Sequence, residues 1–492
     1  MVFGYGGRRG IALGIVACPP LVPPVLHSIV PHGLALSRFL QYVQDARFHL
    51  ESAPLPLIPI ALFSAFRRAS TRCCWALVLR GFRVKIAIVV VCFCALFTIG
   101  SLMSHVMNTY ARLPVAFSHG NGCRITDTEG KTYLDALSGI AVSTLGHNHP
   151  ALVSALTAQA GRLLHTSNLY RMPQQEQLAD KLTAMSGLDE VFFCNSGCEA
   201  NEAAIKLARF YGHQLEIDNP MIIVMEKAFH GRTMATLTAT GNRKTQAGFE
   251  PLVSGFVRVP YNDLEAIRKL AESNKDIVAV MLEMVQGEGG INIADADYQR
   301  GVRKLCDENA WLMICDEVQC GMGRTGQWFG FQHSGIRPDV VTLAKGLGGG
   351  VPIGACIAGG RAAGLFGPGN HGSTFGGNQL ATTAALTTID VVEKEGLIAN
   401  AERVGQQIRE GLTAALRGVE GFVEVRGQGL MIGVELDCSC GDLVMLGLEA
   451  GLIINVTADK VVRLLPALTF SEEEGSELVA RLSQLIRDFL GA

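Results

Sequence analysis

The chain has 492 residues, of which 48% are hydrophobic and 18% are charged, and its formal net charge is −3. This composition is typical of a globular protein with a large core, and the length allows more than one domain. The slightly acidic balance argues against a nucleic-acid partner. The 14 cysteines include no Cys-x-x-Cys pair, so we expect reduced thiols of a cytoplasmic protein and no metal site.

Residues 1–102 differ in texture from the rest of the chain. They carry ten basic and two acidic residues and hold eight of the 18 prolines. The apolar run 84–103 is nearly as long as a membrane span and has basic residues before it. Three explanations remain open: a membrane anchor, a targeting peptide, and a translated extension ahead of a start at Met103 or Met107. We favour a dispensable, disordered extension that does not pack on the body.

An α/β pattern begins at Asn108. We expect an N-terminal segment at 103–165, a large domain at 166–395 and a smaller C-terminal α/β domain at 396–492. The strands expected in the large domain are 190–194, 221–225, 277–283, 311–316, 340–344 and 354–358. Apolar strands with helical patterns between most of them predict a mostly parallel sheet covered by helices. Ligands bind beyond the carboxyl ends of such strands, so the polar residues there are candidates for a site.

Lys345 follows the apolar strand 340–344 directly and is followed by a run of glycines. A lysine is seldom buried unless a group pairs with it. A lysine that forms a Schiff base must lose its proton near neutral pH, and burial or a nearby cation provides that shift. The alternative is a surface lysine beside a glycine turn.

Ser196 and Gly197 follow the strand 190–194 and open a helix. Ser196 and Glu199 fit a capping box, which explains the serine without a ligand. Alternatively, the free main-chain N–H groups of the helix start bind a phosphate, and Gly197 lets the ligand approach closely.

Asp316 ends the strand 311–316. A carboxylate at the end of an apolar strand is unfavourable unless a cation or donor meets it. A pyridinium nitrogen would be such a cation, and a protonated ring acts as an electron sink. The alternatives are a helix N-cap or an ion pair with Arg324.

Three further features lie near strand ends or inside strands. Phe229 could stack on a flat ring and Arg232 could bind a carboxylate, or they are a core aromatic and a solvated arginine. The loop 372–378 offers hydroxyls and main-chain amides that suit a second contact with a phosphate. Arg463 lies inside an apolar strand, so we expect it to meet Glu288, a substrate carboxylate, or each in turn.

Taken together, these residues resemble the site of a known family. From about residue 107 to 492 the chain resembles class III (fold-type I) pyridoxal-phosphate-dependent aminotransferases. The motifs that carry the resemblance lie at 193–203, 229–233, 285–290, 316–319, 343–350 and 371–378. The resemblance departs at Cys198, Met284 and Gln379, where the family more often has other residues, and it does not cover residues 1–102.

The resemblance implies pyridoxal 5′-phosphate as cofactor and assigns roles to residues. Lys345 would hold the cofactor, Asp316 would pair with its ring nitrogen, and Glu288 would act as a switch on an arginine. Further cofactor contacts would be Ser196, Gly197, Cys198, Phe229, Glu317, Val318, Gln319 and Thr374, with Thr374 reaching in from the partner subunit of a homodimer. The substrate contacts would be Arg232, Ser373 and Arg463.

The activity implied by the resemblance is transfer of an amino group from N2-acetyl-L-ornithine to 2-oxoglutarate in arginine biosynthesis. The products would be N-acetyl-L-glutamate 5-semialdehyde and L-glutamate. Alternatives within the fold are succinylornithine, ornithine or 4-aminobutyrate aminotransferases and a semialdehyde aminomutase. A different class of protein, a membrane-anchored non-catalytic binding protein, would use the run 84–103. We expect a cytoplasmic enzyme, because an anchor would send it away from the supply of a phosphorylated cofactor.

Overall fold

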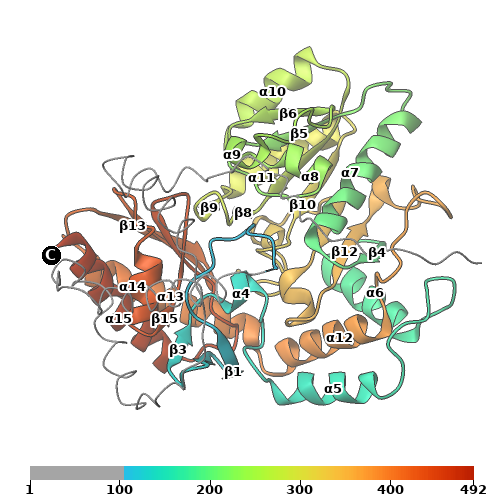
Figure 1. Ribbon diagram of the computed structural model, residues 1–492. Helices are drawn as coiled ribbons and strands as arrows, with labels where there is room; N and C mark the ends of the chain where they lie inside the picture. Colours follow the sequence, from blue (N-terminus) through green and yellow to red (C-terminus); the bar gives the residue numbers. More distant parts are fainter. Residues whose placement is uncertain (1–104) are drawn as a thin grey trace, which may run out of the picture. The chain divides into compact units, whose positions relative to one another are not determined.

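The computed structural model describes residues 105–492, and the chain divides into two compact units, Met1–Thr109 and Tyr110–Ala492. The expected extension at 1–102 and the apolar run 84–103 lie outside the described residues. Every described helix and strand belongs to the second unit (Figure 1). Within residues 105–492, no helix is both long enough and apolar enough to cross a membrane.

A seven-stranded sheet forms the centre of the large domain. Its strands, in spatial order, are β4 (Glu190–Cys194), β12 (Gly354–Ala358), β11 (Val340–Leu343), β10 (Leu312–Asp316), β7 (Ile277–Glu283), β5 (Met221–Met225) and β6 (Phe256–Val259). β12 is antiparallel to both of its neighbours, β4 and β11, and the other six strands run in one direction. Strand β12 follows β11 after the short helix η4 (Lys345–Gly348), and without a crossover helix the chain must reverse direction. The predicted mostly parallel sheet is confirmed.

Helices cover both faces of this sheet, because side chains of a buried strand alternate between its faces. Ile222 packs with α7 (Gly197–Gln214) on one face. Ile223 belongs to the core of the other face, which includes residues of four longer helices. These helices are α6 (Pro173–Ser186), α10 (Leu264–Ser273), α11 (Ala296–Glu308) and α12 (Gln379–Lys394). The sheet is therefore buried on both sides, and its polar residues lie at the strand ends or next to them.

The smaller C-terminal domain has an antiparallel sheet of its own. Its strands, in spatial order, are β13 (Phe422–Gln428), β14 (Met431–Leu436), β17 (Val461–Leu464) and β16 (Asn455–Thr457). Its helices are α13 (Leu397–Leu416), α14 (Leu443–Glu449) and α15 (Glu472–Leu490). Gly396, with φ 64°, separates α12 (Gln379–Lys394) from α13.

The N-terminal segment joins the C-terminal domain in a third sheet. The strands β1 (Phe117–Asn121), β2 (Arg124–Asp127) and β3 (Thr132–Asp135) form an antiparallel meander. β3 also pairs in parallel with β15 (Leu452–Ile453), which lies far along the chain. The segment then forms α4 (Ser138–Ala141) and α5 (Pro150–Ala160), and α5 runs beside α12 (Figure 1). These contacts tie the segment to both domains.

Short elements complete the described unit. They are α8 (Met234–Ala239), α9 (Arg243–Gln246), β8 (Val285–Gln286), β9 (Asn292–Ile293), η3 (Gly330–Ser334) and η5 (Gly360–Ala362).

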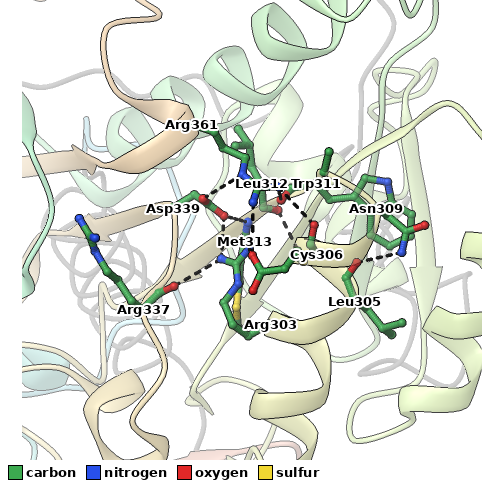
Figure 2. A network of polar contacts seen from close by, with 12 residues as sticks. Arg303, Leu305, Cys306, Asn309, Trp311, Leu312, Met313, Arg337, Asp339 and Arg361 are labelled. Carbon is green, nitrogen blue, oxygen red and sulfur yellow. Dashed lines mark hydrogen bonds and ion pairs between the residues drawn. The ribbon is translucent and has the colours of Figure 1, made fainter.

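A polar network ties the amino ends of the central strands together (Figure 2). Asp339, just before β11, accepts hydrogen bonds from the Met313 N–H (2.8 Å) and from Arg303 Nη1 (2.7 Å). Arg361 donates to the carbonyls of Cys306 and Trp311. The network joins α11, β10, β11 and η5 at the sheet edge away from Lys345, so it serves the fold.

Candidate active site

A cavity of about 320 Å³ opens at the carboxyl ends of the central strands, within the range typical of ligand pockets. Eight of the predicted site residues line it: Ser196, Gly197, Cys198, Phe229, Asp316, Val318, Gln319 and Lys345. They come from segments up to about 150 residues apart in the chain, so the fold gathers them.

Lys345 stands at the start of η4, directly after β11. Its φ of 37° lies in the left-handed region, where a side chain is strained by roughly 1–3 kcal/mol. Burial lowers the pKa of Lys345 below the ordinary value of 10.5, and the negative charge of Glu288 opposes this shift. Within the described residues no hydrogen bond joins its Nζ to another group. The amine is therefore available to a group in the cavity.

Asp316 is 3% exposed and ends β10 beside Lys345 in the same cavity. Its Oδ2 accepts hydrogen bonds from His230 Nδ1 (2.7 Å) and Asn201 Nδ2 (2.8 Å). Its Oδ1 accepts one from the Val318 N–H (3.0 Å). The alternative of an ion pair with Arg324 is wrong, because Arg324 Nη1 donates instead to the main-chain carbonyls of Leu430 and Pro466.

The start of α7 forms one wall of the cavity. Ser196 caps the helix by accepting from the Glu199 N–H (3.2 Å), whereas the Glu199 carboxylate accepts from the Asn195 N–H (2.8 Å). The expected capping box is thus only half formed. A Cβ added at Gly197 would lie 2.7 Å from Val318 Cγ1. The first N–H groups of a helix have no intrahelical acceptor, so this wall suits an anion.

The loop after β5 supplies Phe229 and His230 to the cavity. The Phe229 N–H donates to Glu283 Oε1 at 3.0 Å, which anchors the loop to the end of β7. Arg232 is exposed and does not line the cavity, although its guanidinium lies 5.7 Å from the centre of the Phe229 ring. It stands at the rim, where it can meet a substrate that extends out of the cavity.

Arg463 and Glu288 form an ion pair beside the cavity, as expected, in which the arginine is buried and the glutamate side chain is 36% exposed. Arg463 is 1% exposed on β17, and its Nη1 donates to Glu288 Oε1 at 2.5 Å. Burial raises the pKa of Glu288, but the charge and hydrogen bond of Arg463 outweigh it, so this pKa lies below the ordinary value. Gln319 Oε1 lies 3.4 Å from Arg463 Nη1 and lines the cavity, which links the ion pair to the site.

Besides Arg232, Arg463 and Glu288, three more predicted contacts do not line the cavity of this chain. The Glu317 carboxylate accepts from the main-chain N–H groups of Gly330 (2.8 Å) and Phe331 (2.9 Å), so it caps η3 inside the fold. Ser373 Oγ accepts a hydrogen bond (3.0 Å) from Nδ2 of Asn195. Asn195 lines the cavity, whereas Ser373 does not. Thr374 is exposed.

Four polar lining residues received no role from the sequence: Asn195, Asn201, His230 and Glu283. Glu283 carries the same signal as Asp316, a carboxylate at the end of an apolar strand, and could have been found by it. Burial and the charge of Asp316 raise the pKa of Glu283 well above its ordinary value. His230 and Asn201 lie within the noted motifs, but only the fold shows that both contact Asp316.

A partly buried lysine and a strand-end aspartate in one cavity of such a sheet are typical of enzymes that use pyridoxal phosphate. The chain belongs to the class-III aminotransferase family, whose model matches residues 106–486.

Known relatives place the chain more narrowly. It is 61% identical over 388 residues to acetylornithine aminotransferase from Nitrosomonas europaea, a match that covers 79% of this chain and 99% of the relative. It is 50% identical over 381 residues to acetylornithine aminotransferase from Gloeobacter violaceus (77% and 94% covered). Among solved structures, N-acetylornithine aminotransferase from Stenotrophomonas maltophilia matches with a TM-score of 0.68 and 35% identity (78% and 98% covered). Ornithine aminotransferase from Toxoplasma gondii matches with a TM-score of 0.76 and 31% identity (80% and 98% covered). The expected recognition and fold class are confirmed.

Proposed function

We propose that this chain transfers the δ-amino group of N2-acetyl-L-ornithine to 2-oxoglutarate, a step of arginine biosynthesis. The products are N-acetyl-L-glutamate 5-semialdehyde and L-glutamate. The observation that carries the proposal is that Lys345 and Asp316 line one cavity in a chain 61% identical to an acetylornithine aminotransferase.

The cavity residues fit pyridoxal 5′-phosphate as the cofactor. Lys345 offers a partly buried amine of lowered pKa for the aldehyde. Asp316 offers a carboxylate to the ring nitrogen, and Gly197 leaves room for the phosphate at the start of α7. Phe229 offers an aromatic face to the ring, while Ser196, Cys198, Val318 and Gln319 complete the wall.

The chain's own groups divide the chemistry among them. When bound, the cofactor supplies an electron sink for negative charge at the substrate carbon next to nitrogen. Lys345 Nζ, freed by the incoming amine, moves the proton to and from that carbon as general base and acid. Asp316 would keep the ring nitrogen of the cofactor protonated, because a nearby buried carboxylate favours the positively charged form of that nitrogen.

Arg463 and Glu288 account for two substrates of different shape. With an ω-amine in the cavity, Glu288 keeps the arginine neutralised. With glutamate or 2-oxoglutarate, the α-carboxylate takes the place of Glu288 on Arg463, because both are carboxylates that suit the same guanidinium. Arg232 and Ser373 at the rim would bind the acylated end of acetylornithine.

We also propose a homodimer in which Thr374 completes the partner's phosphate site. Thr374 and Phe375 are exposed, and Phe375 contacts the ring of His165. The nearby Leu169 and Tyr170 are 87% and 68% exposed, and such apolar surface is typical of an interface. Asn168 ties this surface to the loop through the carbonyls of Ser373 and Gly376. Sedimentation of the purified protein tests the dimer.

The domain boundaries at 165/166 and 395/396 and the cytoplasmic location remain part of the proposal. The location is supported by the need for a phosphorylated cofactor, which the cytoplasm supplies. Fractionation of cells that express the full chain tests it, since an anchored protein would sediment with membranes.

The decisive experiment is a substrate panel on the purified protein with 2-oxoglutarate as acceptor. We expect kcat/KM for acetylornithine to exceed that for ornithine and 4-aminobutyrate by at least about tenfold, a difference of about 1.4 kcal/mol in transition-state binding. A preference for succinylornithine, ornithine or 4-aminobutyrate would replace the proposed substrate. Lys345→Ala should abolish turnover with every amine, and retained turnover would refute the role of the lysine.

A further inference from the structure

Asn201 lies on the second turn of α7 and is 1% exposed, yet it reaches three other segments. Its Nδ2 donates to Asp316 Oδ2 (2.8 Å) and to the His230 carbonyl (2.8 Å). Its Oδ1 accepts from Thr342 Oγ1 (2.7 Å), on β11. A buried polar side chain is stable in a core when each of its donor and acceptor atoms has a hydrogen-bond partner. Both Nδ2 and Oδ1 of Asn201 have such partners.

The partners fix which way the Asn201 amide points. The carboxylate of Asp316 and the carbonyl of His230 only accept hydrogen bonds, so the nitrogen must face them. The Thr342 hydroxyl can donate, so the oxygen faces β11. A flipped amide would place an oxygen against two acceptors, which makes the observed orientation the stable one.

This orientation decides which atom of Asp316 faces the cavity. A carboxylate has about four acceptor sites. In the part of the chain that the structure describes, two donors, Asn201 and His230, occupy Oδ2 and one, the Val318 N–H, occupies Oδ1. One acceptor site is left, and it belongs to Oδ1.

We propose that Asn201 is a positioning residue that saturates Asp316 Oδ2 and thereby presents Oδ1 to the ring nitrogen of the cofactor. This inference rests on the proposed function, because it acts through the pairing of Asp316 with that nitrogen. Thr342 supports it from behind by holding the amide; it is the register partner of Asp316 on the neighbouring strand, and within residues 105–492 no side-chain hydrogen bond joins the two.

The test compares two cofactor probes on the apoenzyme: pyridoxal 5′-phosphate and its 1-deaza analogue, in which carbon replaces the ring nitrogen. We expect Asn201→Ala to raise the Kd of pyridoxal phosphate about tenfold, as for loss of a hydrogen bond to a charged group. The Kd of the deaza analogue should change less than about twofold, since it has no nitrogen for Asp316. Equal weakening of both probes, or weakening of neither, overturns the proposal.

Thr342→Val provides a second variant that leaves the Asn201–Asp316 bond in place. It should raise the Kd of pyridoxal phosphate more than that of the deaza analogue, but by less than about threefold. If Asn201→Ala does not fold, as judged by circular dichroism of the apoenzyme, this variant decides: a loss that does not discriminate between the probes refutes the role.

The outcomes also separate the inference from the proposed function. No amine substrate is used, so a wrong substrate leaves the probe comparison intact. A wild-type protein that fails to bind pyridoxal phosphate overturns both. A wild-type protein that binds it, with an Asn201→Ala variant that binds it equally well, overturns only the role of Asn201.

Discussion

Glu283 and Asp316 stand in register at the ends of the neighbouring parallel strands β7 and β10, so two buried carboxyls share one edge of the cavity. Side chains of paired residues in parallel strands point to the same face. Burial first, and then the charge of Asp316, raise the pKa of Glu283 well above its ordinary value of 4.5. Glu283 therefore keeps its proton to a higher pH than an exposed glutamate does.

The first prediction follows from that raised pKa. In the apoenzyme, Glu283→Gln keeps an acceptor for the Phe229 N–H and removes the titration. A raised pKa in the folded state gives stability that is complete below about 4.5 and is lost as pH rises through the raised pKa. The free energy of unfolding of the variant should therefore increase relative to that of the wild type as pH rises above 4.5, by up to about 1.4 kcal/mol per pH unit.

Urea unfolding midpoints of both apoenzymes between pH 5.5 and 8 measure this difference. The charged groups that face Glu283 are Asp316, Lys345 and Glu288, and they are the same in both proteins. A difference in stability that does not depend on pH would contradict a raised pKa of Glu283.

The second prediction concerns the partly buried amine of Lys345. Because the pKa of Lys345 is lowered in the fold, the folded apoenzyme binds fewer protons than the unfolded chain between that pKa and 10.5. Wild-type stability then rises with pH across this window. Lys345→Met should thus stabilise the apoenzyme at pH 7 by about 1 kcal/mol or more, and the gain should shrink towards pH 10.

Lys304→Met is the matched control, because the Lys304 side chain is 76% exposed. It should change stability by less than about 0.5 kcal/mol at either pH. If Lys345→Met destabilised the apoenzyme at pH 7, the amine would have a stabilising partner in the fold and the prediction would fail.

The third prediction tests Glu288 as the group that competes for Arg463. Glu288→Gln removes the negative charge from the guanidinium, so the α-carboxylate of 2-oxoglutarate meets an arginine without its ion pair. We expect KM for 2-oxoglutarate to fall about tenfold, equivalent to about 1.4 kcal/mol, and KM for acetylornithine to rise.

Steady-state kinetics with each substrate varied in turn measure the two constants. Asn455→Ala is the control, since Asn455 holds Arg463 Nη2 at 2.7 Å but bears no charge. An unchanged or higher KM for 2-oxoglutarate in Glu288→Gln would show that the ion pair does not compete with the substrate.

The fourth prediction separates stability from activity through the network in Figure 2. Asp339→Ala leaves Arg303, whose side chain is 13% exposed, without its buried carboxylate, and should lower the free energy of unfolding by about 3 kcal/mol. Asp307→Ala removes a 56% exposed partner of the same arginine and should lower it by less than about 1 kcal/mol. Neither should change kcat/KM, because the network lies at the opposite strand ends, and a loss of kcat/KM in the folded Asp339→Ala protein would contradict this separation.

The sequence alone determined the class of fold and pointed to two groups that the fold brings into one cavity. Apolar runs marked the strands, and a charged residue at the end of such a run singled out Lys345 and Asp316. These signals are local, because a strand end and a glycine turn depend on neighbouring residues.

Only the tertiary structure decided which residues meet. The pairing of β3 with β15, the reversed direction of β12 and the turn of Glu317 towards η3 all depend on packing between distant segments. The same holds for Asn201 and His230, which converge on Asp316 from a helix and a loop. Hydrophobic periodicity fixes which face of an element is buried, but the partner of a buried polar group is set by the side chains that other elements bring to it.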